Sequence, residues 1–325
     1  MAASRSRRLP DLLSRVDSFL RSHVQAGEPL VVGLSGGCDS LVLLHLVVGV
    51  AGGSAVSAIH VHHGLSPNAD DWLEFCQKQC AGLNVPLICR RVAVDRVSGQ
   101  GIEAAARSAR YEAFVDALPA GSALLLAQHR GDQAETLLFN LFRGCGLSGA
   151  AAIRPQRYHH GLRILRPLLS TARAEIECWA RAHQLDWIDD ESNDDRRFSR
   201  NFLRHEVMPA ICQRFPAAEA SLARAAGAFA EASDLLDEMA AADWLLVQHG
   251  ESARMSMLRK LSTPRLKNLL RWRLRCLNWQ APVAARLEEF VRQLQKAGPD
   301  RHPELVLPTG KMRVAAGLLH WVSRG

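Results

Sequence analysis

The sequence contains no apolar run long enough to cross a membrane. The longest, Leu41 to Ala51, is interrupted by His45 and Gly49, whereas a spanning helix needs about 20 apolar residues. The basic N-terminus is not followed by the apolar stretch and cleavage site of a secretory signal. We therefore expect a cytoplasmic protein with no membrane partner.

Paired cysteines are also absent. The eight cysteines are scattered along the 325 residues, and no two of them form a CxxC pair. This distribution indicates reduced thiols in a reducing compartment. A zinc site built from His60, His62 or His63 with Cys76 and Cys80 is an alternative, but the spacing matches no standard structural zinc site.

Lysine is scarce, because 35 of the 40 basic residues are arginine, and the formal net charge is +7. Arginine makes bidentate contacts with phosphate, and a basic protein favours a polyanionic partner such as nucleic acid. A compositional bias towards arginine would explain the same counts without any function. Charge alone therefore leaves nucleic-acid binding open.

Strand and helix patterns alternate up to about residue 214. Strands are expected at 30–34, 56–62, 86–94, 123–128, 163–168 and, less regularly, 186–190. This alternation predicts an α/β fold, a doubly wound, mostly parallel sheet with helices on both faces and ligand loops at the carboxyl ends of its strands. Alanine-rich helical patterns follow, with two short strands around Pro308-Thr309-Gly310. We expect a catalytic domain at 1–214 and a mainly helical domain at 215–325.

A strand, a glycine pair and a helix meet in the segment 30–40, LVVGLSGGCDS. The glycines allow the backbone to approach a phosphate, and successive N–H groups with the positive end of the helix dipole form an anion site. The patterns GxxxxGK[ST] and GxGxxG are both absent here. The segment instead resembles the SGGxDS motif of the PP-loop pyrophosphatase superfamily, whose members cleave ATP to AMP and pyrophosphate.

This resemblance implies that the loop binds ATP. The expected nucleotide-binding residues are Ser35, Gly36, Gly37, Cys38, Asp39 and Ser40. A carboxylate beside phosphates is favourable mainly when a divalent cation lies between them, so Asp39 is the expected Mg²⁺ ligand. A turn that merely joins strand to helix would explain the glycines, but not the two serines and the aspartate.

Further motifs follow in order. They are HVHHGL at 60–65, EAAAR at 103–107, AQHRGDQAET at 127–136, RGCGL at 143–147, RPL at 166–168, WIDDESN at 187–193 and RNFLR at 200–204. Together they resemble the tRNA(Ile)-lysidine synthases, a PP-loop (adenine nucleotide alpha hydrolase-like) family, over about residues 28–212. That family implies an AMP-forming ligase. ATP adenylates the wobble cytidine of an isoleucine tRNA with a CAU anticodon, and free L-lysine then displaces AMP to give lysidine.

The resemblance also implies site residues. Asp132 and Glu135, three residues apart on one helix face, would bind the incoming lysine and assist its deprotonation. Arg107 and Arg200 would stabilise charge on phosphate or on the activated base, and His60 would contact the nucleotide. With Asp39, these two acids and two arginines are the expected catalytic residues. A helix N-terminus that favours acids would explain Asp132 and Glu135 without catalysis.

Two positions depart from the family, and one segment suggests an RNA contact. Gln128 and Gly131 stand where family members usually carry histidine and aspartate. The segment 255–276 contains seven basic residues and no acidic one, which predicts a helix that grips an RNA backbone. A face of mixed charge in solvent is the alternative.

Two other functions remain open from the sequence. A PP-loop enzyme that thiolates tRNA would share the loop, although such enzymes use paired cysteines, which are absent here. A non-catalytic tRNA-binding protein would share the charge. Arg110, Arg143 and Arg204 are weaker site candidates, and a homodimer is left open.

Overall fold

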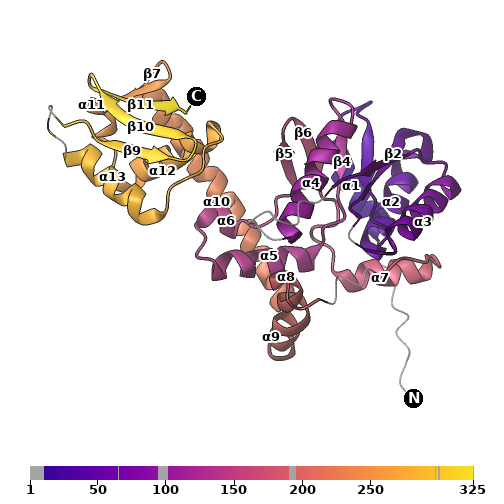
Figure 1. Ribbon diagram of the computed structural model, residues 1–325. Helices are drawn as coiled ribbons and strands as arrows, with labels where there is room; N and C mark the ends of the chain where they lie inside the picture. The colour runs from indigo at the N-terminus through magenta and orange to yellow at the C-terminus, as the bar shows by residue number, and fades with distance from the viewer. Residues whose placement is uncertain are drawn as a thin grey trace. The chain divides into compact units, whose positions relative to one another are not determined.

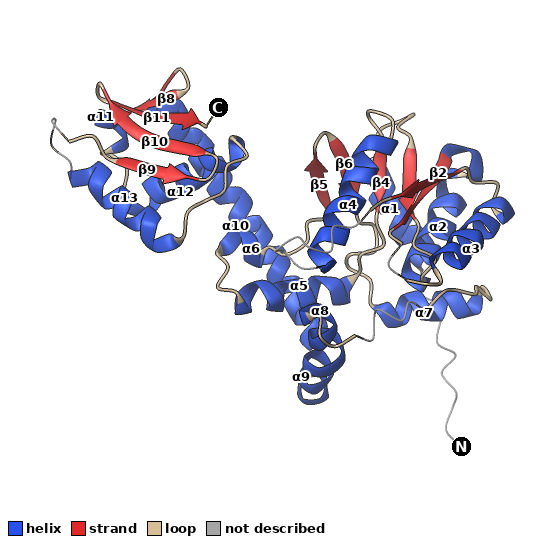
Figure 2. Ribbon diagram, viewed as in Figure 1, coloured by secondary structure: helices blue, strands red, loops and turns tan. Residues whose placement is uncertain are grey.

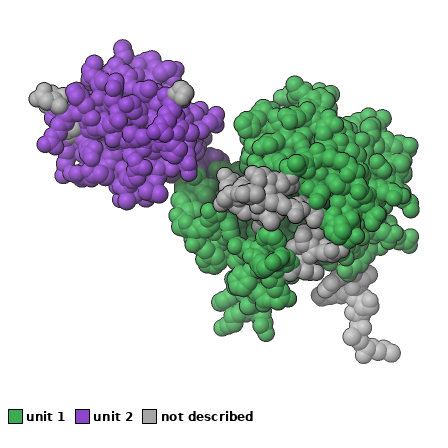
Figure 3. Space-filling view, viewed as in Figure 1, with its two compact units in different colours: residues 1–230 green, residues 231–325 purple. Residues whose placement is uncertain are grey.

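The computed structural model describes residues 11–64, 66–93, 102–189, 195–296, 298 and 301–324. The chain divides into two compact units, Met1–Ala230 (unit 1) and Glu231–Gly325 (unit 2), coloured separately in Figure 3. The boundary falls within the long helix α10 (Ala218–Val247). Among the described residues, no helix combines the length and apolar character needed to cross a bilayer.

Unit 1 is built on a six-stranded sheet with the order β3-β2-β1-β4-β6-β5 (Figures 1 and 2). Its parallel strands are β1 (Leu30–Gly33), β2 (Val56–His62), β3 (Leu87–Arg91), β4 (Ala123–Leu125) and β6 (Leu162–Leu165). The edge strand β5 (Gln156–His159) is antiparallel to β6. The predicted doubly wound, mostly parallel fold is confirmed, with one antiparallel strand that the sequence pattern did not reveal.

Helices cover both faces of this sheet. The helices described before α10 are α1 (Leu12–His23), α2 (Cys38–Ala51), α3 (Ala69–Gly82), α4 (Ile102–Ala117), α5 (Arg130–Phe142), α6 (Leu147–Ala150), α7 (Arg173–Ala182), α8 (Ser199–Phe202) and α9 (Met208–Arg214), with a short 3₁₀ turn at Gly53–Ala55. Leu30 and Val32 of β1 pack in the cluster that contains α1 and α2, whereas Val31 packs with Tyr111 and Phe114 of α4. Because successive strand side chains point to opposite faces, β1 is buried on both.

The strand order reverses beside β1. The chain passes from β1 to β2 on one side, and β4 pairs with β1 on the other. The loops that follow β1 and β4 therefore leave the sheet side by side, at the position where open α/β sheets bind ligands. These are the segments that carry the SGGCDS and AQHRGDQAET motifs.

The helical segment 199–214 is not uniform. Between α8 and α9, residues Leu203–Val207 form a π-helix. Such segments are rare and are frequent at functional sites. This π-helix carries Arg204, whose contacts are described below.

Unit 2 combines the end of α10 and the helices that follow it with a sheet. The helices that follow α10 are α11 (Met255–Leu258), α12 (Thr263–Cys276) and α13 (Ala284–Lys296). The antiparallel sheet has the order β7-β8-β11-β10-β9, from β7 (Gln248–His249), β8 (Ser252–Arg254), β9 (Glu304–Leu307), β10 (Gly310–Ala315) and β11 (Leu318–Ser323). Leu269, Leu270, Phe290, Met312 and Leu319 belong to its core.

Two sequence expectations are corrected here. The strand expected at 186–190 is absent over 186–189, which have no regular structure, and residue 190 lies outside the described residues. The two strands expected around Pro308-Thr309-Gly310 do form, as β9 and β10, but they belong to a five-stranded sheet. The additional strands are short or follow the turn at Ala316 and Gly317, where both residues have positive φ.

Candidate active site

Two serines form hydrogen bonds within the loop between β1 and α2 and fix its conformation. Ser40 Oγ donates to the carbonyl oxygen of Gly37 at 2.9 Å and accepts from the Ser35 N–H at 3.2 Å. The Gly37 N–H donates to Ser35 Oγ at 3.3 Å. No side chain caps the N-terminus of α2, so the helix end is available to an anion.

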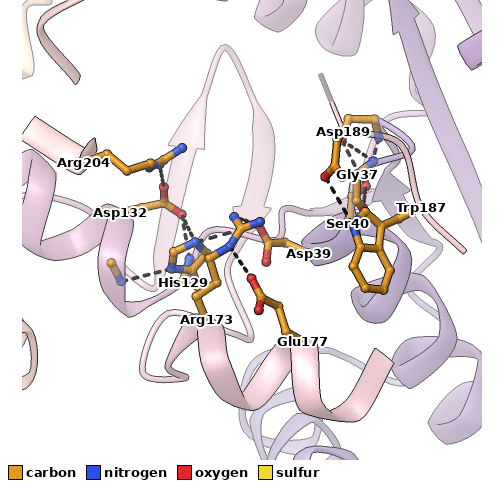
Figure 4. A network of polar contacts seen from close by, with 12 residues as sticks. Gly37, Asp39, Ser40, His129, Asp132, Arg173, Glu177, Trp187, Asp189 and Arg204 are labelled. Carbon is orange, nitrogen blue, oxygen red and sulfur yellow. Dashed lines mark hydrogen bonds and ion pairs between the residues drawn. The ribbon is translucent and has the colours of Figure 1, made fainter. Parts of the chain in front are cut away.

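Gly36 has a conformation that explains its residue type. Its φ is +91°, and a Cβ atom there would lie 2.7 Å from Ile188 Cδ1. The Ile188 N–H donates to the Gly36 carbonyl oxygen at 3.0 Å. The segment Trp187–Asp189 thus lies along the loop, and Figure 4 shows Asp189 beside Gly37.

A cavity of about 870 Å³ opens at this end of the sheet. It is lined by Ser35, Gly37, Cys38, Asp39, Ser40, His60, Arg107, Asp132 and Arg200 among the expected site residues, and also by Arg110, His129, Arg173, Asp189 and Arg204. Its volume suits a ligand of nucleotide size. Of the expected residues, Gly36 and Glu135 are not in the wall.

Arg204 holds the two acids of α5. Its guanidinium contacts both Glu135 oxygens, at 2.8 and 2.9 Å, and Asp132 Oδ1 at 3.0 Å. Glu135 is only 4% exposed. Burial raises the pKa of its carboxyl group, although Arg204 opposes the shift. Sequence reasoning ranked Arg204 low, because nothing local to residue 204 indicates these partners.

His129 lies between the acids of the two loops. Its Nε2 is 3.8 Å from Asp39 Oδ2 and 3.6 Å from Asp132 Oδ2 (Figure 4). Its Nδ1 accepts the Gly131 N–H at 3.0 Å. In the neutral ring the proton is therefore on Nε2, facing the carboxylates. His129 belongs to the AQHRGDQAET motif, but the sequence predicted no role for its side chain.

One carboxylate oxygen of Asp39 is paired with an arginine, and the other has no partner among the described residues. Its Oδ2 accepts from Arg173 Nη1 at 3.1 Å, and Arg173 also contacts Glu177 at 3.0 Å. Its Oδ1 is buried and has no hydrogen-bond partner among the described residues. Burial is the main cause that raises the pKa of the Asp39 carboxyl group. Arg173 was missed from the sequence, since it belongs to no motif and reaches Asp39 only through the fold.

Cys38 and His60 contribute little reactive character. Burial raises the pKa of the Cys38 thiol to about 12, so the thiol remains protonated near neutral pH. His60 is buried, and its Nδ1 lies 2.9 Å from the Leu34 carbonyl oxygen. Burial also lowers the pKa of His60. Both side chains line the cavity as neutral groups.

The two departures from the family pattern have separate surroundings. Gln128 Oε1 accepts a hydrogen bond from Arg166 Nε. A Cβ at Gly131 would lie 2.8 Å from His129 Cε1 and 3.1 Å from Nδ1. Gly131 therefore permits the observed position of His129, which a larger residue would displace.

The basic face expected on 255–276 is partly neutralised within unit 2. Four of its seven cations form ion pairs with acids from other parts of unit 2: Arg265 with Asp243, Lys267 with Glu288, Arg273 with Glu251 and Arg275 with Asp237. Arg273 also lies 4.3 Å from the centre of the Trp244 ring. The face has mixed charge, and its acids come from segments distant in sequence.

The nucleotide loop at the switch point of the sheet and the charged groups opposite it define a PP-loop enzyme of the ATP-pyrophosphatase type. A family model for the PP-loop domain matches residues 9–211, and a model described as the TilS substrate binding domain matches residues 254–320. The chain belongs to the tRNA(Ile)-lysidine synthase family, which confirms the resemblance inferred from its motifs.

Similar proteins support this assignment. The chain is 45% identical to the tRNA(Ile)-lysidine synthase of Pseudomonas aeruginosa over 90% of this chain and 68% of that protein. Identity to the enzymes of Aromatoleum aromaticum and Nitrosomonas europaea is 47% and 39%, covering 87% and 99% of this chain. It spans 66% and 71% of their lengths.

One solved structure has a similar fold. It is the U34-tRNA thiolase NcsA of Methanococcus maripaludis, with a TM-score of 0.56 and 16% identity, over 68% of this chain and 78% of the thiolase. At this identity, the similarity concerns the fold alone.

Proposed function

We propose that this chain forms lysidine in a tRNA. In the first step the carbonyl oxygen of the wobble cytidine, in an isoleucine tRNA with a CAU anticodon, attacks the α-phosphorus of ATP and releases pyrophosphate. In the second step the side-chain amine of L-lysine attacks the activated ring carbon, AMP leaves with the oxygen, and the amine loses a proton. The observation that carries the proposal is one cavity with a phosphate loop and an acid cluster.

The nucleotide would occupy the Ser35–Ser40 loop. Its uncapped helix end and backbone N–H groups suit a triphosphate. A magnesium ion fits, because Asp39 Oδ1 is buried and accepts no hydrogen bond from a described residue, and carboxylate oxygens suit Mg²⁺. When bound, the ion supplies neutralisation of the triphosphate charge.

The amine would meet the acid cluster. Asp39, Asp132 and Glu135 contribute three carboxylates, and the guanidinium groups that contact them belong to Arg173 and Arg204. This balance favours a cationic substrate. A carboxylate within this group can accept the proton that the lysine amine must lose.

Arg107 and Arg200 would act on the developing charge. Both line the cavity, and Arg200 lies 5.9 Å from the centre of the Phe139 ring. A guanidinium fixed near the reacting phosphate stabilises charge that appears in the transition state. The free cysteines are typical of the cytoplasm, where we place the enzyme.

Mass analysis of tRNA nucleosides tests the proposal. After incubation with ATP, magnesium and lysine, one cytidine should gain the mass of lysine minus water, and omission of ATP or lysine should prevent the gain. Unmodified cytidine under all conditions would contradict the proposal. A gain of sulfur would support the thiolation alternative, which the high pKa of Cys38 does not favour.

A further inference from the structure

Several arginines gather around Tyr111, outside the acid cluster. Arg107 Cζ lies 5.3 Å from the centre of the Tyr111 ring and Arg157 Cζ lies 5.6 Å from it. Arg107 and Tyr111 are on α4, and Arg157 is on the edge strand β5. Arg166, which directly follows β6, is close enough to affect the electrostatics of Tyr111. We call Arg107, Tyr111, Arg157 and Arg166 the Tyr111 cluster.

The arginines of this cluster differ from the other cavity arginines in their partners. Within the described parts of the chain, Arg107, Arg157 and Arg166 form no ion pair. Arg166 is only 2% exposed, and its partners are neutral: Gln128 Oε1 and the Arg154 carbonyl oxygen, the latter at 2.8 Å. Burying a guanidinium without a counter-ion is costly. A bound anion would offset this cost.

The Tyr111 hydroxyl is a further buried polar group in this cluster. Tyr111 is 5% exposed, and its hydroxyl makes no well-formed hydrogen bond with a described residue, although Arg166 lies near enough for the phenol to influence that guanidinium. Burial would raise the pKa of Tyr111, but Arg107 and the neighbouring guanidinium groups outweigh burial and lower it. The local electrostatic potential is thus strongly positive, and the Tyr111 hydroxyl lies there as a hydrogen-bond donor.

Two arginines of the cluster are accessible, one from the cavity and one from solvent. Arg107 lines the cavity, and Arg157 is exposed. An anion bound here would contact α4 and the β5–β6 hairpin, whereas the Ser35–Ser40 loop joins β1 to α2. The two anion sites are therefore built from different segments.

We propose that the Tyr111 cluster is a second phosphate site, which binds a backbone phosphodiester of the RNA strand that carries the target base. Arginine suits this role because its fork of donors matches phosphate oxygens. A phosphate of ATP or pyrophosphate has the same chemistry and is the competing source. The RNA assignment rests on the proposed function, whereas phosphate binding itself does not.

The variant Arg157→Gln tests the site in the full chain. Arg157 is exposed, so the variant should fold, and Arg157→Lys keeps the charge. We would measure affinity for the CAU-anticodon tRNA against salt concentration, without ATP. Loss of one phosphate contact should lower the slope of log K against log salt by about 0.7 to 0.9 and weaken binding roughly fivefold at 0.1 M salt. Arg157→Lys should recover most of the slope.

The matched control is Arg21→Gln, because Arg21 is paired with Asp17 on α1 and is not part of the cavity wall, so the slope should be unchanged. Affinities for ATP and for pyrophosphate, without RNA, should be equal in Arg157→Gln and the unmodified protein. A fall in either would overturn the RNA source in favour of a nucleotide phosphate. An unchanged slope together with unchanged ATP and pyrophosphate affinities would overturn the site.

These outcomes are separable from those of the proposed function. If the unmodified protein forms no lysidine but Arg157→Gln still lowers the salt slope, the phosphate site stands and the proposed reaction fails. If lysidine forms and no affinity changes in Arg157→Gln, the reaction stands and the site fails.

Discussion

The arginines of α12 and those of the Tyr111 cluster contrast in one respect. Arg265, Arg273 and Arg275 are close together in sequence, yet each meets an acid in the folded unit 2. Arg107, Arg157 and Arg166 are scattered in sequence, yet they converge on one tyrosine and form no ion pair with a described residue. Charge density along a sequence is therefore a poor guide to charge that remains available to a ligand.

The acid cluster beside the cavity differs from both regions. Its three carboxylates contact two guanidinium groups, so its charges are paired but not equal in number. This difference predicts that substitutions in the cavity will alter chemistry, whereas substitutions of paired cations on α12 will alter little.

The largest effect is expected for Asp39→Asn. Loss of the charge at the nucleotide loop should reduce AMP formation by about a thousandfold, because a metal-bound triphosphate would lose its protein carboxylate. Release of AMP in the presence of tRNA and lysine measures this. Turnover near that of the unmodified protein would remove Asp39 from the catalytic site.

The next largest effect is expected for Glu135→Gln. The variant keeps the shape but loses the charge that faces Arg204 behind the cavity wall, which changes the electrostatics of the proposed lysine site, so the KM for lysine should rise about thirtyfold, equivalent to about 2 kcal/mol. Adenylation without lysine should be largely retained. An unaltered lysine KM would show that Glu135 only positions Arg204.

The pKa of Glu135 predicts a pH effect of several-fold size. Burial raises this pKa. On acidification, the Glu135 carboxylate is therefore protonated at a higher pH than that of an ordinary glutamate. In the unmodified protein, the lysine KM should therefore begin to rise, as the pH is lowered, at a higher pH than an ordinary glutamate would give. In Glu135→Gln, the part of the profile due to this group should be flat. Parallel profiles would exclude Glu135 as the titrating group.

Gly131→Ala should have a smaller effect. The added Cβ would meet the His129 ring at 2.8 Å, so the ring must move away from the position between Asp39 and Asp132. Misplacement of a group in the cavity should lower kcat up to about tenfold. Gly82→Ala on α3 is the control, since a Cβ there would meet no atom within 4 Å. Equal effects of the two variants would show that the effect of Gly131→Ala does not come from displacement of His129.

The smallest effect is expected for the double variant Arg273→Gln with Arg275→Gln. Both arginines are paired within unit 2, so the salt dependence of tRNA binding should change by less than the loss of one contact, about 0.7 to 0.9 in slope. A loss of two contacts' worth of slope would restore α12 as the RNA-binding face.

The sequence predicted those parts of the site that are encoded locally. The SGGCDS loop requires a positive φ at Gly36 and hydroxyls at Ser35 and Ser40, and each requirement is visible in the residue types. Asp132 and Glu135 share a helix face because they are three residues apart. Arg173 and Arg166 have no such local sign, since their partners Asp39 and Gln128 are distant in sequence.

The same distinction explains the errors in the fold. The alternating pattern predicted the parallel core because β1, β4 and β6 are mostly buried and apolar. β5, with the sequence QRYH, is a polar edge strand, and β7 has only two residues, so neither has a pattern to recognise. The segment 186–189 has strand-like residues but lies along the nucleotide loop, where Ile188 pairs with Gly36.

The π-helix at Leu203–Val207 has a consequence for how this site can vary. The hydrogen bonds of a π-helix span five residues and not the four of an α-helix, so the segment accommodates one extra residue, and Arg204 points where it does only while that residue is present. Removing a single residue from this stretch would restore regular pitch and rotate Arg204 away from Asp132 and Glu135. The charge distribution in the cavity thus depends on the winding of the backbone as well as on side-chain identity. A deletion here would alter that distribution without replacing a charged residue.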